Sequence, residues 1–191
     1  MPRMTPLCVA GRRDATNLTC RSSALSPMAV ADKLPTGDKM LYPLRFKPIF
    51  KPRIWGGRRL AELYGKSLPP GVDIGESWEL SGLPGDESVV ADGPLAGATL
   101  GDLVRRFGRD LLGTTSPVDG QFPLLVKLLD ARRNLSVQVH PSAEMVRRRG
   151  GACRLKHECW FVIDAEPGAC LWLGLNDGVT RERFAAAVSD G

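Results

Sequence analysis

In parts of the chain, apolar and polar residues alternate with a period of two, the spacing of side chains on a β-strand. Strand-like runs, some of them alternating, predict strands at 44–50, 77–81, 87–91, 122–128, 135–139, 158–164 and 170–175. A helical period begins at Thr99, and a second helix is expected at 181–188. Many short strands with one or two helices predict a mainly β fold, either a jelly roll or a β-barrel.

Two of these predicted strands bring polar groups to one face. Ser136, Gln138 and His140 alternate with apolar residues, and Lys156 and Glu158 share a face by the same rule. Imidazole nitrogen with carboxylate and amide oxygen is a ligand set for zinc or a similar divalent metal. A polar face is also ordinary in an antiparallel sheet with one solvated side, and the spacing leaves both interpretations open.

Six segments occur in the order and roughly the spacing of a known family. From residue 42 onward the chain resembles the type I mannose-6-phosphate isomerases (phosphomannose isomerases), particularly the short bacterial form. The resemblance is carried by residues 44–50 with 53–57, 75–81, 122–130, 135–141, 158–160 and 164–168. It implies a mainly β, cupin-type jelly roll or β-barrel with a few helices. It also implies a zinc-dependent aldose–ketose isomerase that interconverts mannose 6-phosphate and fructose 6-phosphate.

The resemblance also implies roles for individual residues. Gln138, His140 and Glu158 correspond to metal ligands in the family, which holds one Zn2+ per complete enzyme. The residues that correspond to the lining of the sugar-phosphate pocket are Lys127, Ser136 and Lys156. No residue of this chain is identified as the general base, so the catalytic residues stay open.

The chain also departs from the family pattern. It contains two histidines, His140 and His157, so the family's distal histidine ligand is not among its residues. The family's catalytic arginine, which lies on a later strand, is not among them either. Strand alternation turns His157 away from Glu158, so we expect it to be a neighbour of the metal site and not a ligand. These departures suggest the N-terminal part of the enzyme, with a barrel that is incomplete at the C-terminal end. The alternative is a non-catalytic cupin-like module that binds a sugar phosphate or a metal.

The composition and the net charge limit the class of protein and its expected partners. The 191 residues are 43% hydrophobic and 25% charged, with a net charge of +5, which describes an ordinary globular protein. Residues 1–39 carry six Lys or Arg and three Asp or Glu, so the rest is nearly neutral and nucleic acid is not expected as a partner. No apolar run reaches the length of a membrane span. Five irregularly spaced cysteines predict no disulfide framework and favour the reducing cytoplasm. The sequence leaves the oligomeric state open.

These observations divide the chain into two segments. Residues 40–191 are expected to form the N-terminal part of the isomerase domain, and residues 1–39 a disordered extension. The extension is rich in Arg and Ser, which is typical of an organellar transit peptide. A start codon assigned too early, with Met40 or Met28 as the true beginning, explains the same composition.

Overall fold

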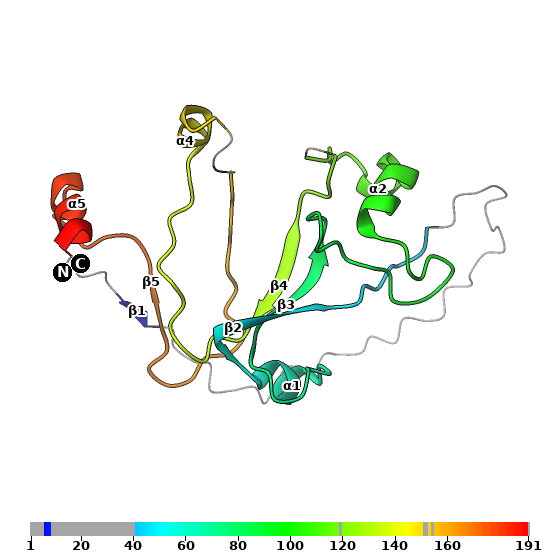
Figure 1. Ribbon diagram of the computed structural model, residues 1–191, viewed down its shortest axis with the longest axis horizontal. Helices are drawn as coiled ribbons and strands as arrows, with labels where there is room; N and C mark the ends of the chain where they lie inside the picture. Colours follow the sequence, from blue (N-terminus) through cyan, green and yellow to red (C-terminus); the bar gives the residue numbers. More distant parts are fainter. Residues whose placement is uncertain (1–5, 9–40, 119, 151–152, 154, 191) are drawn as a thin grey trace, which may run out of the picture. The chain divides into compact units, whose positions relative to one another are not determined.

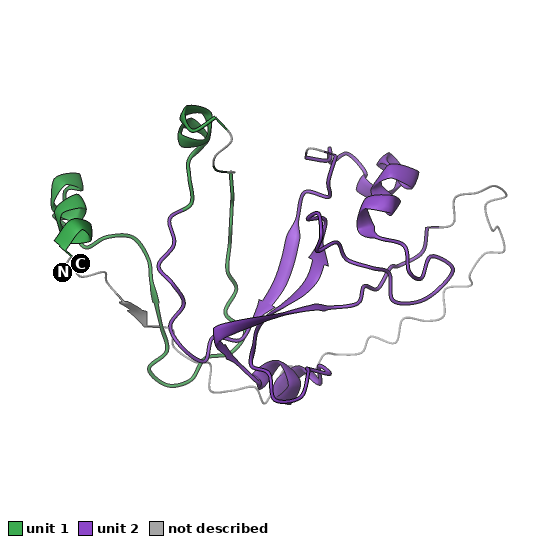
Figure 2. Cartoon of the chain, in the orientation of Figure 1, with its two compact units in different colours: residues 1–30, 140–191 green, residues 31–139 purple. Residues whose placement is uncertain are grey.

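The computed structural model describes residues 6–8, 41–118, 120–150, 153 and 155–190. The chain divides into two compact units. Unit 1 comprises residues 1–30 and 140–191, and unit 2 comprises residues 31–139 (Figure 2).

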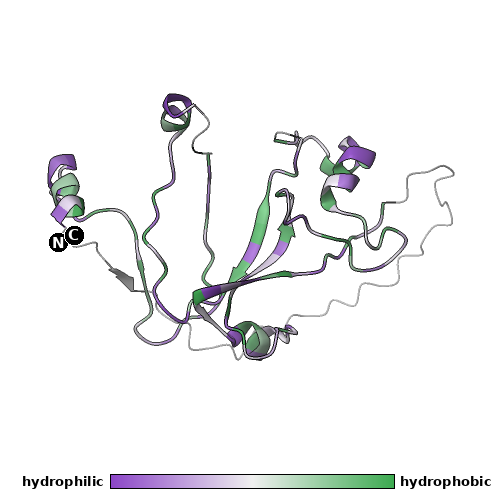
Figure 3. Cartoon of the chain, in the orientation of Figure 1, coloured by the Kyte–Doolittle hydropathy of each residue, from purple (hydrophilic) through white to green (hydrophobic). Residues whose placement is uncertain are grey.

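Unit 2 is built on an antiparallel sheet with the strand order β2-β3-β4 (Figure 1). The strands are β2 (Ile49–Gly57), β3 (Ile74–Ser81) and β4 (Leu125–Leu129). Helix α1 (Arg59–Tyr64) joins β2 to β3, and helices α2 (Leu100–Phe107) and α3 (Arg109–Leu112) precede β4. Figure 3 shows β3 and β4 as apolar strands interrupted by polar positions. The predicted mainly β character is confirmed in this unit.

Two small apolar clusters form the core of unit 2. In the first, Leu60 of α1 packs with Leu68 and Ile74, and Phe50 and Leu128 of the sheet lie against them. The second cluster joins α2 to the segments that flank it. Its buried members are Val90, Leu103 and Phe107. Each cluster therefore fixes one helix against an extended segment.

The start of β3 lies unusually close to β2. A Cβ atom at Gly56 would lie 2.5 Å from the backbone nitrogen of Gly75. One at Gly75 would lie 2.6 Å from the Cβ atom of Arg53. Both glycines are therefore required by close backbone approach. The buried carboxylate of Asp130, just after β4, accepts a hydrogen bond of 2.7 Å from the backbone N–H of Arg59 and so caps α1 from a distance.

The helix predicted at Thr99 is confirmed, and so is its start signal. The Thr99 hydroxyl accepts a hydrogen bond from the backbone N–H of Asp102, whose carboxylate accepts one in return from the backbone N–H of Thr99. This reciprocal pair is a capping box, which satisfies two backbone N–H groups at the helix start. The apolar face of α2 is buried as the period predicts, because Leu100, Leu103 and Phe107 are each at most 4% exposed.

Unit 1 contains short elements separated by extended chain. They are α4 (Ala143–Arg148), β5 (Cys170–Trp172) and α5 (Arg181–Asp190). Strand β1 (Pro6–Cys8) pairs antiparallel with β5. The helix expected at 181–188 is confirmed as α5. Within residues 1–39, β1 is the part that the structure describes, so the prediction of a disordered extension falls on residues outside the description.

Three predicted strands are not formed as strands. Residues 135–139 and 158–164 are extended but carry no ladder hydrogen bonds, and 87–91 contributes isolated bridges from Val89 and Val90. A strand is defined by its hydrogen-bonded neighbour, and these segments have no continuous partner strand among the described residues. Alternation alone therefore predicted the faces of these segments without predicting whether they pair.

Candidate functional site

Lys127, predicted to line a sugar-phosphate pocket, lies in the middle of β4 opposite Trp78 of β3. Its ammonium nitrogen is 3.3 Å from the Oε1 atom of Glu76. The other carboxylate oxygen of Glu76 accepts hydrogen bonds from the Trp78 indole N–H at 2.9 Å and from Arg53 at 3.0 Å. The sheet therefore places a lysine, an arginine and a tryptophan around one carboxylate.

The Glu76 carboxylate is charged in spite of its burial. Its side chain is 8% exposed, and burial raises the pKa of a carboxyl group because it penalises the charged form. The hydrogen bond from Trp78 and the positive charges of Lys127 and Arg53 outweigh that effect, so the pKa of Glu76 lies below its usual value. We therefore treat Glu76 as an anion at neutral pH.

A third cation lies on the same face of the sheet. Lys51 is the cross-strand partner of Glu76, and its ammonium nitrogen lies 4.6 Å above the Trp78 ring. Lys51 also forms an ion pair with Asp86. The face around Glu76 therefore carries three cations and two carboxylates beside an aromatic ring.

Ser136 and Gln138 lie in the extended segment that follows β4. Both side chains are exposed, and the Gln138 amide nitrogen lies 3.4 Å from the Ser136 hydroxyl. This contact agrees with the prediction that Ser136 and Gln138 share a face. No strand fixes their orientation within the described part of the chain.

His140 and Glu158 face one another in unit 1. The Nε2 atom of His140 lies 3.5 Å from the Oε2 atom of Glu158. That Nε2 atom is buried and has no hydrogen-bond partner among the described residues. Lys156, on the other side, lies 3.3 Å from the same Glu158 oxygen. The structure thus brings three of the six predicted site residues together around Glu158, and His140 lies 18 positions before it in the sequence.

The geometry of this pair can be compared with that of a metal site. Two ligand atoms bound tetrahedrally to zinc at about 2.0–2.1 Å lie roughly 3.3–3.4 Å apart. The 3.5 Å separation between His140 and Glu158 is close to that value. A buried imidazole nitrogen without a hydrogen-bond partner among the described residues is also chemically suited to bind a metal ion. The two residues therefore fit a divalent metal.

The remaining observations limit the site. His157 is exposed, in agreement with the prediction that it is not a ligand. Among the described residues, no cluster of three or more His, Cys, Asp or Glu side chains could hold a metal ion. Lys127, Ser136 and Gln138 belong to unit 2, while His140, Lys156 and Glu158 belong to unit 1. The contact of Lys127 with Glu76 and that of Ser136 with Gln138 therefore lie within unit 2, and the contacts of Glu158 with His140 and Lys156 lie within unit 1.

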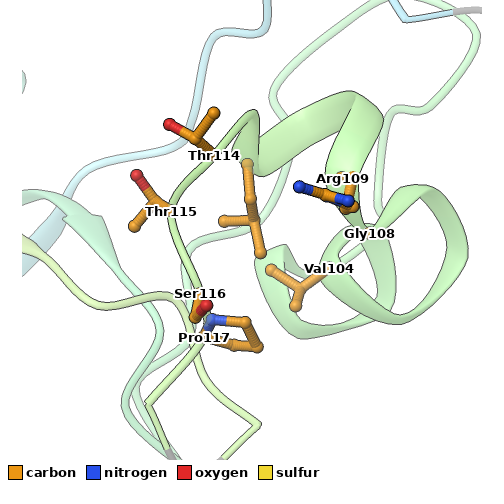
Figure 4. A pocket seen from close by; sticks show the side chains of 8 residues that line it. Val104, Gly108, Arg109, Thr114, Thr115, Ser116 and Pro117 are labelled. Atoms are coloured by element: carbon orange, nitrogen blue, oxygen red, sulfur yellow. The ribbon is translucent and has the colours of Figure 1, made fainter.

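Glu76, which contacts the predicted site residue Lys127, and Arg53, which contacts Glu76, were not predicted as site residues from the sequence. Alternation in β3 places Glu76 and Trp78 on one face, and that signal was available. What the sequence could not supply was the register that brings Lys127 of β4 opposite Trp78. A separate hollow lies beside α2 and α3 and is lined by Arg109 and by residues 114–117, without any of the predicted site residues (Figure 4).

Known proteins resemble this chain over its larger part. A sequence model of the catalytic domain of type I phosphomannose isomerase matches residues 43–158. The probable mannose-6-phosphate isomerase GmuF of Bacillus subtilis is 40% identical over 153 residues, which are 80% of this chain and 47% of that protein. Mannose-6-phosphate isomerase ManA of the same organism is 39% identical, over 78% of this chain and 45% of that protein. The chain thus spans about half the length of the curated relatives it matches.

A solved structure also resembles this chain. The crystal structure of mannose 6-phosphate isomerase from Bacillus subtilis superposes with a TM-score of 0.51 at 36% identity, covering 59% of this chain and 35% of that one. The expected mainly β, cupin-type fold is supported by this likeness. Within the described residues, no helix is both long and apolar enough to cross a membrane. The motif order, the sheet and these matches lead to one conclusion: the chain belongs to the type I phosphomannose isomerase family.

Proposed function

We propose that this chain carries part of the active site of a zinc-dependent isomerase that interconverts mannose 6-phosphate and fructose 6-phosphate. Family membership supports the reaction class. The single structural observation that supports the metal is the buried Nε2 atom of His140, which faces Glu158 and has no hydrogen-bond partner among the residues that the structure describes.

His140 and Glu158 would hold the zinc ion, with Gln138 as the third protein ligand. When bound, a divalent metal supplies a Lewis acid that polarises the substrate carbonyl next to the carbon that loses its proton. Lys156 lies 3.3 Å from the Glu158 carboxylate and would help to orient it.

The phosphate group of the substrate needs positive partners. A phosphate monoester carries close to two negative charges at neutral pH. Lys127 and Lys156 supply ammonium donors for it, and the exposed hydroxyl of Ser136 offers a further hydrogen bond. The general base of the proposed reaction is not assigned to a residue of this chain.

The test measures bound zinc per chain together with fructose 6-phosphate formed from mannose 6-phosphate. We expect His140→Ala and Glu158→Gln to lower zinc affinity about 10-fold or more, since each removes a ligand. His157→Ala is the matched control, because it removes an exposed imidazole next to the site and should leave zinc unchanged.

Each outcome has a distinct meaning. Equal zinc in all three variants contradicts the metal assignment. Zinc that depends on His140 and Glu158 without turnover contradicts catalysis by the 191-residue chain and favours a module that binds metal without isomerisation. Dependence of both zinc and turnover on these two residues confirms the proposal.

A further inference from the structure

Glu76 is the buried acidic residue at the centre of the cation-rich face of the sheet. It is 6% exposed and accepts hydrogen bonds from residues on three strands, namely Arg53 of β2, Trp78 of β3 and Lys127 of β4. A buried carboxylate is costly unless its lone pairs are satisfied by donors and its charge is compensated. Here both conditions are met by side chains far apart in sequence.

The two carboxylate oxygens have separate partners. Oε1 faces the Lys127 ammonium at 3.3 Å, whereas Oε2 accepts from Arg53 and from the indole of Trp78. Trp78 and Arg53 thus hold one oxygen and thereby fix the direction of the other. A flexible four-carbon lysine side chain gains a defined position from such an anchored partner.

Two cations surround the one carboxylate of this group. Glu76 is the anion, and Arg53 and Lys127 are the cations that pair with it. The Lys127 side chain is 19% exposed, so it is partly accessible from solvent. A cation held in a defined position is suited to an anionic ligand.

We propose that Glu76 is a positioning residue that holds Lys127 in place for a phosphorylated sugar. The part that concerns the ligand rests on the proposed function, in which Lys127 contacts the sugar phosphate. The part that concerns Glu76 and Lys127 stands on the contacts within the sheet. Glu76 acts through Lys127 and does not itself touch the substrate.

The experiment is competitive labelling of lysines in the 191-residue chain with acetic anhydride, read by mass spectrometry. The reagent acylates the neutral amine, and an ion pair with a carboxylate favours the unreactive ammonium, so the labelling rate at Lys127 reports how tightly the pair is held. We expect Glu76→Gln to raise the labelling rate at Lys127 about 5- to 10-fold, because a hydrogen bond between charged groups is lost. Glu79→Gln is the matched control. It neutralises the carboxylate three positions along β3, which pairs with Lys66, and should leave the labelling rate at Lys127 unchanged.

Mannose 6-phosphate added to the same reaction tests the ligand. We expect it to protect Lys127 in the parent chain and to protect it less in Glu76→Gln. Simple electrostatics predicts the opposite, because removing a negative charge should strengthen binding of an anion. Weaker protection therefore identifies positioning, and stronger protection in the variant overturns it.

The failures of the two proposals are distinguishable. If the parent chain is not protected by mannose 6-phosphate, Lys127 does not contact the sugar phosphate, and the ligand part of the proposal is overturned. If the labelling rate at Lys127 is the same in Glu76→Gln and in the parent chain, Glu76 does not hold the lysine, whatever the ligand does.

A second measurement needs no variant at Glu76. The indole N–H of Trp78 donates to Glu76, so its NMR resonance should move as that carboxyl group titrates. We expect the inflection to lie below the ordinary glutamate pKa of about 4.3, because Lys127 and Arg53 favour the charged form. An inflection at or above that value shows that the cations do not hold this carboxylate, and overturns the proposal.

Discussion

The two units of this chain use similar sequence patterns with different results. Unit 2 contains every residue that is fully buried, among them Leu60, Ile74 and Leu103, when the described residues are compared. The described residues of unit 1 include none that is buried, although Phe161 and Ile163 are large and apolar. An apolar residue therefore does not create a core by itself. It needs a second element packed against it.

A direct comparison is that of β4 with the segment 135–139. Both lie in segments predicted as strands and are separated by a few positions; β4 is Leu-Val-Lys-Leu-Leu, whereas 135–139 alternates apolar and polar residues. β4 pairs with β3, and Leu128 packs against the first apolar cluster. In the segment 135–139, Val137 and Val139 are 73% and 83% exposed. The difference is the presence of a hydrogen-bonding neighbour, because strand stability comes from cross-strand pairs and burial.

The largest expected effect comes from the core of unit 2. Leu103 is 1% exposed and packs with Val90 and Phe107, so Leu103→Ala should lower the free energy of unfolding by about 2–5 kcal/mol. Phe161, in unit 1, is 87% exposed, and Phe161→Ala should change the free energy of unfolding by about 0.5 kcal/mol or less. Urea denaturation followed by circular dichroism measures both. Equal destabilisation by the two substitutions would break the contrast between the units.

A smaller effect is expected where β2 and β3 approach closely. In Gly56→Ala, the new methyl group would meet backbone atoms of Ile74 and Gly75 at 2.5–2.8 Å. The strands must separate, and overpacking of this kind costs about 1–3 kcal/mol.

Gly174 of unit 1 provides the control for this substitution. It has a φ of +70°, with nothing within 4 Å of an added Cβ atom, so Gly174→Ala strains the backbone only locally. The urea midpoint should fall in Gly56→Ala and stay unchanged in Gly174→Ala. An unchanged midpoint in both variants would mean that the β2–β3 approach does not limit stability.

The smallest effect concerns two helix caps with the same chemistry. The hydroxyls of Thr99 and Ser142 each accept a hydrogen bond from a backbone N–H in the first turn of α2 and α4, respectively. Thr99→Ala should lower the free energy of unfolding by about 1 kcal/mol, since α2 is packed into the second apolar cluster.

Ser142→Ala should fray α4 without lowering that free energy, because α4 contributes no buried residue. Hydrogen exchange of the amides in α4 would detect the fraying, and the urea midpoint would detect any wider effect. A lower midpoint in Ser142→Ala would show that α4 is coupled to a cooperative core.

The sequence predictions were correct where a structure depends on neighbouring residues, and wrong where it depends on residues far apart in the sequence. The helix at Thr99 depends on a hydroxyl and a carboxylate three positions apart and on an apolar period, all local, and it was predicted correctly. Residues 77–81 of β3 were also correct, because alternation there coincides with two partner strands. The prediction at 158–164 was wrong as to pairing, since a strand requires a neighbour that local sequence cannot supply.

The candidate site shows the same division. By alternation, the sequence placed Ser136 with Gln138 and Lys156 with Glu158, and both pairs are in contact. It did not predict that Glu76 joins Lys127 to Arg53, because that contact depends on the register of three strands. The role of Gln138 as a third ligand stays a prediction.

By itself, the sequence determined the family, the faces of the strands, and the start of α2, because these depend on residue types at short spacings. Tertiary structure decided which alternating segments pair, how closely β2 approaches β3, and that Glu76 is buried yet charged. Those properties arise from hydrogen bonds, packing and charge between residues distant in sequence, whose energies exist only once the chain has brought them together.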